Sequence, residues 1–337
     1  MHQVNSKKSS VPLITIFDTS VCSSNLGDLI IMDAVRKILR EVFRDALFVS
    51  LQTHDRISRK SYSLISQSLF TFVGGTNLLM SGMGNPRRFK QWEIGLPDAF
   101  YVKDSILLGV GWWQYQEKVD LFSSILYKKL LNQSYLHSVR DSYTEKKLKS
   151  MGIENVINTS CPTMWLLDEK HCIGIPSKRA QSVLLTLTEY KQHKDADLEL
   201  FQLLRKEYEK IYFWTQQPGD YKYMKEISGD EVIYLYPSLE ALDDFLLKNE
   251  IDYIGTRLHA GIRALQNKRR TLILAVDNRA VEISRDTNLP VIQRNDYKGI
   301  EEWINSCNKT KILLPENNIQ KWKNQFLNFS CCEGSLD

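Results

Sequence analysis

The 337-residue sequence lacks the features that mark several large classes of protein. Its six cysteines form no C-x-x-C pair and no metal-ligand spacing, which argues against a disulfide scaffold and fits a reducing compartment. No stretch holds about 18 consecutive apolar residues, and the polar start Met1–Ser10 is not typical of a signal peptide. Four of the histidines belong to no cluster with the spacing of metal ligands: His54, His137, His171 and His193. We therefore expect a cytoplasmic protein and predict no metal site.

The glycine and serine patterns of common enzyme families are also missing. The sequence contains neither a dinucleotide fingerprint, nor a P-loop, nor the G-x-S-x-G elbow of serine hydrolases. There is no zinc-finger spacing and no aromatic RNP pattern, so nucleic acid is not expected as a partner. Residues 1–162 hold 20 Lys+Arg against 14 Asp+Glu. An excess of this size is usual for a solvated surface, and it also allows peripheral contact with the inner face of the membrane.

The sequence does contain a regular alternation of short β-branched or aromatic runs with longer amphipathic stretches. The runs predicted as strands are Leu13–Phe17, Ala46–Leu51, Leu69–Val73, Ser105–Val110, Tyr135–Val139, Val156–Thr159, Val183–Thr188, Ile211–Thr215, Val232–Tyr236, Tyr253–Thr256, Thr271–Val276 and Pro290–Gln293. The stretches predicted as helices are Asp28–Phe43, Lys118–Leu131, Ser142–Met151, Leu198–Tyr208, Leu239–Lys248, Ala260–Asn267, Ala280–Thr287 and Pro315–Phe329. This alternation is typical of βαβ units with parallel sheets.

The length of the chain exceeds that of one hydrophobic core, which favours two domains. We predict an α/β protein in which two Rossmann-like domains face each other across a central cleft. The first domain is expected over residues 1–165 and the second over residues 166–314. A C-terminal helix and tail should follow over residues 315–337.

Two glycine-containing turns of the first half could meet a ligand, because open α/β sheets bind ligands at the carboxyl ends of their strands. The first turn contains Asn25, Gly27 and Asp28 and opens a helix, so its N–H groups could bind an anion. An ordinary turn with Asp28 as the helix cap explains the pattern equally well. Gly74 and Gly75 end a later strand, where they either let the backbone approach a ligand or simply make the turn.

Polar and aromatic residues further along suit the binding of a sugar. The loop after the paired glycines holds Arg87, Arg88 and Trp92, although a plain surface loop is as compatible with this composition. Trp112 and Trp113 end the next strand. Because neighbouring side chains of a strand point to opposite faces, one of these two tryptophans should line the cleft.

Two further strand ends carry reactive groups. Arg140 would lie at the cleft with Ser142 nearby, or it pairs with a carboxylate while Asp141 or Ser142 caps the helix. Cys161 stands beside the predicted hinge. Without a visible activating partner, a buried inert thiol is favoured over a reactive one.

The triplet Arg257-Leu258-His259 is the most informative feature of the sequence. It stands where an apolar strand ends and a helical pattern begins, so free N–H groups of the helix favour an anion there. Arginine binds a carboxylate or phosphate with two parallel hydrogen bonds, and histidine can transfer a proton near neutral pH. This arrangement suits an anionic substrate that undergoes proton transfer. The alternative is a surface arginine beside a structural histidine.

Together these motifs resemble the polysaccharide pyruvyl transferase family. The matching segments are Asn25-Leu26-Gly27-Asp28, Gly74-Gly75-Thr76-Asn77-Leu78, Gly109-Val110-Gly111, Val139-Arg140-Asp141-Ser142, Lys149-Ser150-Met151-Gly152 and Gly255-Thr256-Arg257-Leu258-His259-Ala260. The resemblance covers about residues 13–295. It implies a GT-B-like fold and the transfer of pyruvate from phosphoenolpyruvate onto sugar hydroxyls as a ketal, in capsule or exopolysaccharide assembly. No cofactor is required besides this donor substrate, although phosphate release could use a divalent metal.

The resemblance also implies roles for single residues. Arg140 and Arg257 would bind the carboxylate and phosphate of the donor, and His259 would be the catalytic residue, as acid or as base. Further donor contacts are expected from the glycine turns: Asn25, Gly27, Gly74, Gly75 and Thr76. The saccharide acceptor, including a lipid-linked one, is expected at the first domain, and the candidates for this side of the cleft are Asp28, Asn77, Arg87, Arg88, Trp92, Trp112, Trp113 and Ser142.

The sequence departs from the family at three positions. Cys161 replaces the aspartate of an Asp-Pro pair, Thr76 replaces a third glycine, and Arg279 stands where a lysine is common. These departures leave the identity of the donor open. Two alternatives therefore stand beside pyruvyl transfer: a GT-B glycosyltransferase with a nucleotide-sugar donor, and a non-catalytic saccharide-binding subunit.

Overall fold

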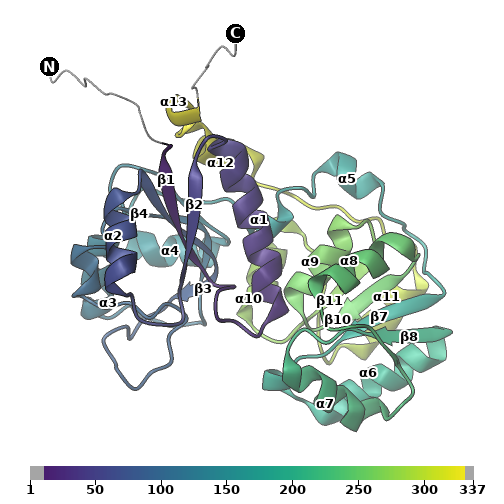
Figure 1. Ribbon diagram of the computed structural model, residues 1–337. Coiled ribbons are helices and arrows are strands. Elements are labelled where there is room, and N and C mark those ends of the chain that lie inside the picture. The colour runs from purple at the N-terminus through teal and green to yellow at the C-terminus, as the bar shows by residue number, and fades with distance from the viewer. Residues whose placement is uncertain (1–10, 331–337) are drawn as a thin grey trace, which may run out of the picture.

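The computed structural model describes residues 11–330 and contains two parallel sheets of six strands each (Figure 1). The first sheet has the strand order β2-β1-β3-β4-β5-β6, and the second has the order β12-β11-β10-β7-β8-β9. Neighbouring strands in both sheets run parallel. This confirms the prediction of parallel α/β sheets. Residues 1–10 and 331–337 of the predicted first domain and tail lie outside the described residues.

The predicted strands all overlap strands of the structure. The first sheet consists of β1 (Leu13–Asp18), β2 (Leu47–Gln52), β3 (Phe70–Leu79), β4 (Ser105–Trp112), β5 (His137–Val139) and β6 (Val156–Asn158). The second sheet consists of β7 (Ser182–Thr186), β8 (Lys210–Phe213), β9 (Ile233–Tyr234), β10 (Asp252–Gly255), β11 (Thr271–Ala275) and β12 (Val291–Gln293). Most of these strands are buried along their length, which is why apolar runs in the sequence locate them.

The paired glycines Gly74 and Gly75 do not end a strand as predicted, because β3 continues through them to Leu79. A Cβ atom on Gly75 would lie 2.2 Å from the side chain of Ile31, which is part of helix α1. The backbone at Gly75 and Thr76 has positive φ angles of 28° and 70°, and the pairing with β4 shifts register after Thr76. The glycines therefore let α1 pack closely on the strand, and the irregularity alters the end of β3.

The helices fill the connections between the strands. They are α1 (Leu26–Val42), α2 (Arg59–Gln67), α3 (Leu121–Leu130), α4 (Ser142–Ser150), α5 (Glu169–Ile173), α6 (Lys194–Glu207), α7 (Pro218–Ser228), α8 (Leu239–Lys248), α9 (Leu258–Gln266), α10 (Asn278–Thr287), α11 (Tyr297–Asn305), α12 (Glu316–Asn324) and α13 (Leu327–Ser330). The helices α2, α5, α7 and α11 were not predicted. No helix in the described part of the chain combines the length and the apolar character that crossing a membrane requires.

Helix α1 joins the two halves of the molecule. Its first turn is capped by the side chain of Asn25, which accepts a hydrogen bond from the N–H of Gly27. Ile31 and Val35 pack into the core of the first sheet, whereas Ile30 packs into a core cluster of the second sheet. Figure 1 shows α1 between the two sheets, and it contacts both β3 and α9. The helix therefore fixes how the two sheets face each other.

The chain returns to the first sheet after completing the second. The predicted helix Pro315–Phe329 forms as two shorter helices, α12 and α13, on the side of β1 and β2 (Figure 1). Trp322 and Phe326 are fully buried and pack with Phe72 and neighbouring aromatic rings of the first domain. The end of the chain is thus part of the first hydrophobic core.

Candidate active site

A cavity of about 470 Å³ lies between the two sheets. In each sheet the order of strands reverses at one point, next to β1 and β3 in the first and next to β7 and β10 in the second. Asn25 and Asp28 follow β1, Thr76 and Asn77 lie at the end of β3, and Tyr190 follows β7; all five side chains line the cavity. Open α/β sheets bind ligands at such reversal points. The volume lies within the range of sites for small molecules.

The two walls of this cavity differ in chemistry. The cations that line it, Lys191 and Arg279, both come from the second domain. Amide, hydroxyl, acidic and aromatic side chains make up the wall of the first domain: Ser23, Ser24, Asn25, Asp28, His54, Thr76, Asn77, Phe89, Gln91, Trp113 and Gln114. An anionic ligand is therefore favoured at one wall, and a neutral polyhydroxylated ligand suits the other.

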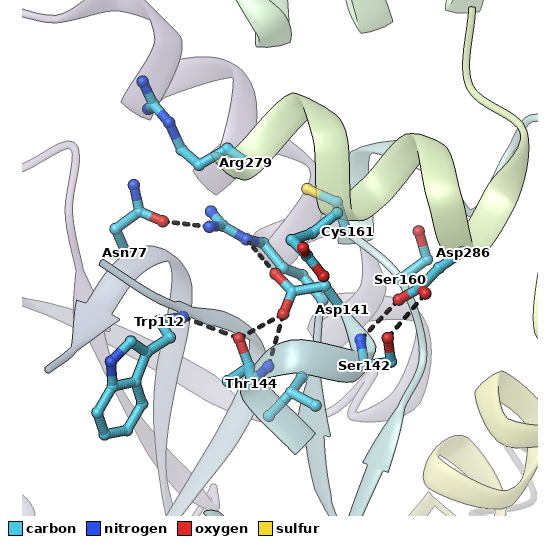
Figure 2. Close-up of polar contacts among 12 residues, drawn as sticks. Asn77, Trp112, Asp141, Ser142, Thr144, Ser160, Cys161, Arg279 and Asp286 are labelled. Atoms are coloured by element: carbon cyan, nitrogen blue, oxygen red, sulfur yellow. Dashed lines mark hydrogen bonds and ion pairs between the residues drawn. The ribbon is translucent and has the colours of Figure 1, made fainter. Parts of the chain in front are cut away.

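Arg279 is held at the start of α10. Its guanidinium hydrogen-bonds both carboxylate oxygens of Asp277 at 2.6–3.0 Å and donates to the hydroxyl of Tyr190 at 2.7 Å. Figure 2 shows the side chain of Arg279 extending from the helix on the same side as Asn77. A guanidinium fixed by such contacts presents its remaining N–H groups in one orientation.

Arg140 lies at the end of β5 and is 1% exposed. Its Nε donates to Asp141 at 3.1 Å, and its Nη2 donates to the amide oxygen of Asn77 (Figure 2). Nη1 is buried and has no partner among the described residues. A Cβ atom on Gly111 would lie 2.2 Å from Nε, so this glycine makes room for the guanidinium. Because a buried donor without a partner is costly, Nη1 would gain from a hydrogen bond to an anionic ligand.

Arg257 caps α9 and is 2% exposed. Its Nε and Nη2 donate to the carboxylate of Asp220, and its Nη1 donates to Gln217 at 2.7 Å. The ring of Tyr190 covers the guanidinium at 5.1 Å. Gln217 and Tyr190 line the cavity, whereas Arg257 lies one side chain behind the wall. Three of its five N–H groups are used by these protein contacts, which leaves two for a ligand.

His259 lies in the first turn of α9 and is 6% exposed. Burial, with a smaller contribution from the nearby charges of Arg279 and Arg140, lowers its pKa to about 3. Its Nε2 lies 3.8 Å from the sulfur of Cys161, and burial raises the pKa of that thiol. Both partners are therefore neutral near pH 7. In the unliganded protein the imidazole is a proton acceptor.

The structure brings part of the predicted site together. The predicted residues that line the cavity are Asn25, Asp28, Thr76, Asn77 and Trp113. Arg140, Arg257 and His259 lie directly behind its walls. Of the two adjacent tryptophans, Trp113 faces the cavity and Trp112 is buried in the core, as the alternation of side chains along a strand predicts.

Other residues that were predicted for the site do not line the cavity. Gly27 packs against Gln216, and Gly74 packs against Met32, so neither lines the cavity. Trp92 is 1% exposed within the core of the first sheet, which corrects its placement at the cleft. The predicted placement of Trp112 at the cleft is also wrong, because this side chain is fully buried in the same core.

Three more residues of the predicted acceptor side do not line the cavity. Arg87 is exposed, and Arg88 stacks over the ring of Trp113 at 5.3 Å. Ser142 begins α4 and donates through its N–H and hydroxyl to Asp286 of the second domain at 2.6 and 2.8 Å (Figure 2). Arg88 therefore supports a wall of the cavity, and Ser142 supports the contact between the domains.

Several residues of the site were not predicted. Tyr190, Lys191 and Gln217 follow strands of the second sheet, and Tyr190 and Lys191 belong to no recognisable motif. Asp220, the partner of Arg257, completes a capping box at the start of α7 with Gln217. The spacing of Gln217, Pro218 and Asp220 is the signal that would have located this helix and its acid. Among the described residues, no group of three or more His, Cys, Asp or Glu side chains is placed to hold a metal ion.

A second cavity of about 820 Å³ adjoins the first and shares Ser24 and Gln217 with it. Its wall contains Tyr221, Tyr234 and Tyr236. Aromatic rings with exposed edges are suited to stack on a sugar ring or a base. The candidate site can therefore extend from the first cavity into the second, along the interface between the two domains.

The fold and the site define an α/β protein with two facing Rossmann-like domains and a cleft that has cations on one wall and a buried histidine nearby. The family model of polysaccharide pyruvyl transferases matches residues 25–278, and the chain belongs to this family. Membership implies a transferase with a saccharide acceptor. No curated protein matches the sequence.

Solved structures with the same architecture support the fold. S. aureus MnaA, in a co-structure with UDP, aligns with a TM-score of 0.53 and 14% identity over 95% of this chain and 98% of that chain. The Methanocaldococcus jannaschii UDP-GlcNAc 2-epimerase, in complex with UDP-GlcNAc and UDP, aligns with a TM-score of 0.52 and 12% identity over 94% and 98%. These similarities concern the fold alone and confirm the predicted GT-B-like arrangement.

Proposed function

We propose that the protein transfers pyruvate from phosphoenolpyruvate to hydroxyls of a saccharide, forming a ketal during assembly of a capsule or exopolysaccharide. The observation that carries this proposal is the environment of His259. The histidine is buried and neutral, and it interacts electrostatically with Arg140 of the first domain and Arg279 of the second. A donor with a carboxylate and a phosphate would match cations from the two domains, which would hold it beside the histidine.

The donor would complete the hydrogen bonds of the buried arginines. Arg140 has an unpaired Nη1, and Arg257 retains two N–H groups beyond those bound to Asp220 and Gln217. In the proposal these two arginines bind the carboxylate and phosphate. Arg279 lines the cavity and adds charge to the same wall. The fixed orientation of all three guanidinium groups limits the donor to one pose.

His259 would move a proton during addition of the acceptor to the donor. Its neutral form takes a proton from an attacking hydroxyl and passes it to the methylene carbon, which becomes a methyl group. Phosphate then leaves, and a second hydroxyl attacks the same carbon to close the ketal. Binding of the anionic donor between Arg140 and Arg279 offsets the charges that lower the pKa of His259.

The test is a phosphate-release assay with phosphoenolpyruvate and a panel of acceptors. The panel contains methyl glycosides of glucose, galactose and mannose, their N-acetylamino counterparts, UDP-sugars and a lipid-linked saccharide. We expect release of phosphate that depends on an acceptor, together with a pyruvylated product in the mass spectrum. His259→Asn should lower kcat by about 100-fold or more, the size of a lost proton-transfer group.

Folding of the His259→Asn protein is checked by its thermal transition. His193→Asn is the matched control, because His193 caps helix α6 and does not line the cavity. Full activity of the His259 variant would refute the catalytic assignment. Saccharide binding without turnover of any donor would instead favour a non-catalytic binding subunit.

The second candidate is a transferase that uses a nucleotide-sugar donor. The tyrosine-lined cavity next to the site favours it, because a base or a second sugar would fit against Tyr221 and Tyr236. The change in melting temperature on addition of each donor distinguishes the two candidate functions. Stabilisation by phosphoenolpyruvate supports pyruvyl transfer, whereas stabilisation by UDP-sugars without any effect of phosphoenolpyruvate would favour this alternative.

A further inference from the structure

We propose that His54 is a second proton-transfer residue of the cavity, which takes a proton from a hydroxyl of the bound acceptor. This inference rests on the proposed pyruvyl transfer and assigns the acceptor side of that reaction. His54 follows β2 in the first domain and lines the cavity together with Asp28 and Gln91. It therefore stands on the wall opposite the cations Lys191 and Arg279.

The hydrogen bonds of His54 define its tautomer. Its Nε2 lies 3.2 Å from the carbonyl oxygen of Thr19. A carbonyl oxygen can only accept, so Nε2 carries the hydrogen in this contact. The neutral ring then has a lone pair on Nδ1. Nδ1 is buried and has no hydrogen-bond partner among the described residues, so the protein leaves this acceptor for a ligand.

The neighbours of His54 are suited to a sugar. Asn77, Gln91 and Trp113 line the same wall, and they supply amide hydrogen bonds and an aromatic face. Asp28 lies close enough to interact electrostatically with His54, and its carboxyl group accepts a hydrogen bond from Ser23 at 2.7 Å. The wall therefore combines acceptor recognition with a proton acceptor.

The proton balance of ketal formation identifies the proton that His54 would remove. Ketal formation on two hydroxyls breaks two O–H bonds, the π bond of the C=C group and the bond between carbon and the phosphate oxygen. It forms two C–O bonds and one C–H bond. One hydroxyl proton ends on the former methylene carbon, by way of His259. The other is released with phosphate, and we assign its removal from the second hydroxyl to Nδ1 of His54.

The experiment compares His54→Gln with wild type by the rate at which the pyruvylated ketal product forms, followed by mass spectrometry with the acceptor that wild type uses, because His54 acts after phosphate has left. Glutamine can still donate to the Thr19 carbonyl from the position of Nε2, but it provides no basic nitrogen at Nδ1. We expect kcat to fall by about 100-fold or more, while KM for phosphoenolpyruvate stays within about twofold. His171→Gln is the matched control, because the Nε2 of His171 contacts the carbonyl oxygen of Leu265 at 2.8 Å away from the cavity.

Each outcome bears on the inference. A His54→Gln protein with the kcat of wild type would overturn it and leave pyruvyl transfer standing. Absence of phosphate release by wild type with every acceptor would overturn the proposed function, and the inference with it. If the glutamine variant folds poorly, His54→Ala is assayed with and without added imidazole. Recovery of turnover by imidazole supports the inference, and no recovery in a folded His54→Ala protein refutes it.

Discussion

Among single residues, Cys161 contacts the ring of His259 directly. The neutral thiol lies 3.8 Å from Nε2 and accepts a hydrogen bond from Thr163 at 3.1 Å. A thiol in this state gives the imidazole no negative charge to hold a proton. Burial therefore dominates the pKa of His259, which lies at about 3. The expectation of a buried thiol at this position is met, because Cys161 is 2% exposed.

Replacing Cys161 by aspartate should make the activity of the enzyme depend on pH. A carboxylate about 4 Å away favours the protonated ring and should raise the pKa of His259 by about 1 to 3. The neutral form is then lost as pH falls through the raised pKa of about 4 to 6, so turnover should decline from pH 8 to pH 4. Wild type, whose His259 stays neutral over this range, should show no such decline from this group.

The matched control is Cys161→Asn, which has the size of aspartate but no charge. The ratio of the two activities is measured at pH 4 and at pH 8, since this cancels the ionisation of the substrates. A ratio that does not change with pH, or a relative gain by the aspartate variant at pH 4, would argue against His259 as the proton acceptor.

Among structural elements, β4 determines where Arg140 can lie. Gly111 in this strand contacts the guanidinium, whose other neighbours are Asn77 and Asp141. The sequence shows the glycine and the arginine as separate motifs about thirty residues apart. Only the pairing of β4 with β5, at Val110 and Val139, brings them together.

Gly111→Ala should therefore weaken the binding of phosphoenolpyruvate. The new Cβ would lie 2.2 Å from the Arg140 Nε, so the guanidinium must move. Loss of one charge-assisted hydrogen bond corresponds to about tenfold or more in KM, and overpacking should cost about 1–3 kcal/mol of stability. KM and the thermal transition are measured together. Gly95→Ala is the control, because the nearest neighbour of a Cβ atom at this position would be 3.6 Å away. Equal effects of both substitutions would contradict the role of Gly111 in making room for Arg140.

Across the whole molecule, contacts between the domains hold the two walls of the cavity in place. Asp286 on α10 accepts hydrogen bonds from the N–H and hydroxyl of Ser142 and from the amide of Asn158. Tyr115 of the first domain donates to Glu282 of the second at 2.5 Å. These bonds join helix α10, which carries Arg279, to the domain that carries Arg140. The relative position of the two cations thus depends on the interface.

The C-terminal helices should contribute strongly to the stability of the first domain. Phe326 is fully buried among the rings of Phe43, Phe70 and Phe72. Phe326→Ala should lower the free energy of unfolding by about 3–5 kcal/mol, because it removes a large buried side chain and leaves a cavity. Denaturant unfolding measures the change. Phe329→Ala is the control at an exposed ring, and a loss no larger than that of the control would show that α12 and α13 are dispensable.

The sequence by itself determined the pattern of strands and helices, since buried parallel strands require apolar runs and the helices between them require amphipathic periods. It also located His259, Arg257 and Arg140, because these side chains follow directly from strand ends. Tertiary structure alone decided that Asp220 binds Arg257 and that His54 faces the same cavity as Asp28. These residues come from different strand ends, and no local pattern encodes a distance between them. Packing of the two sheets around α1 places them in one site.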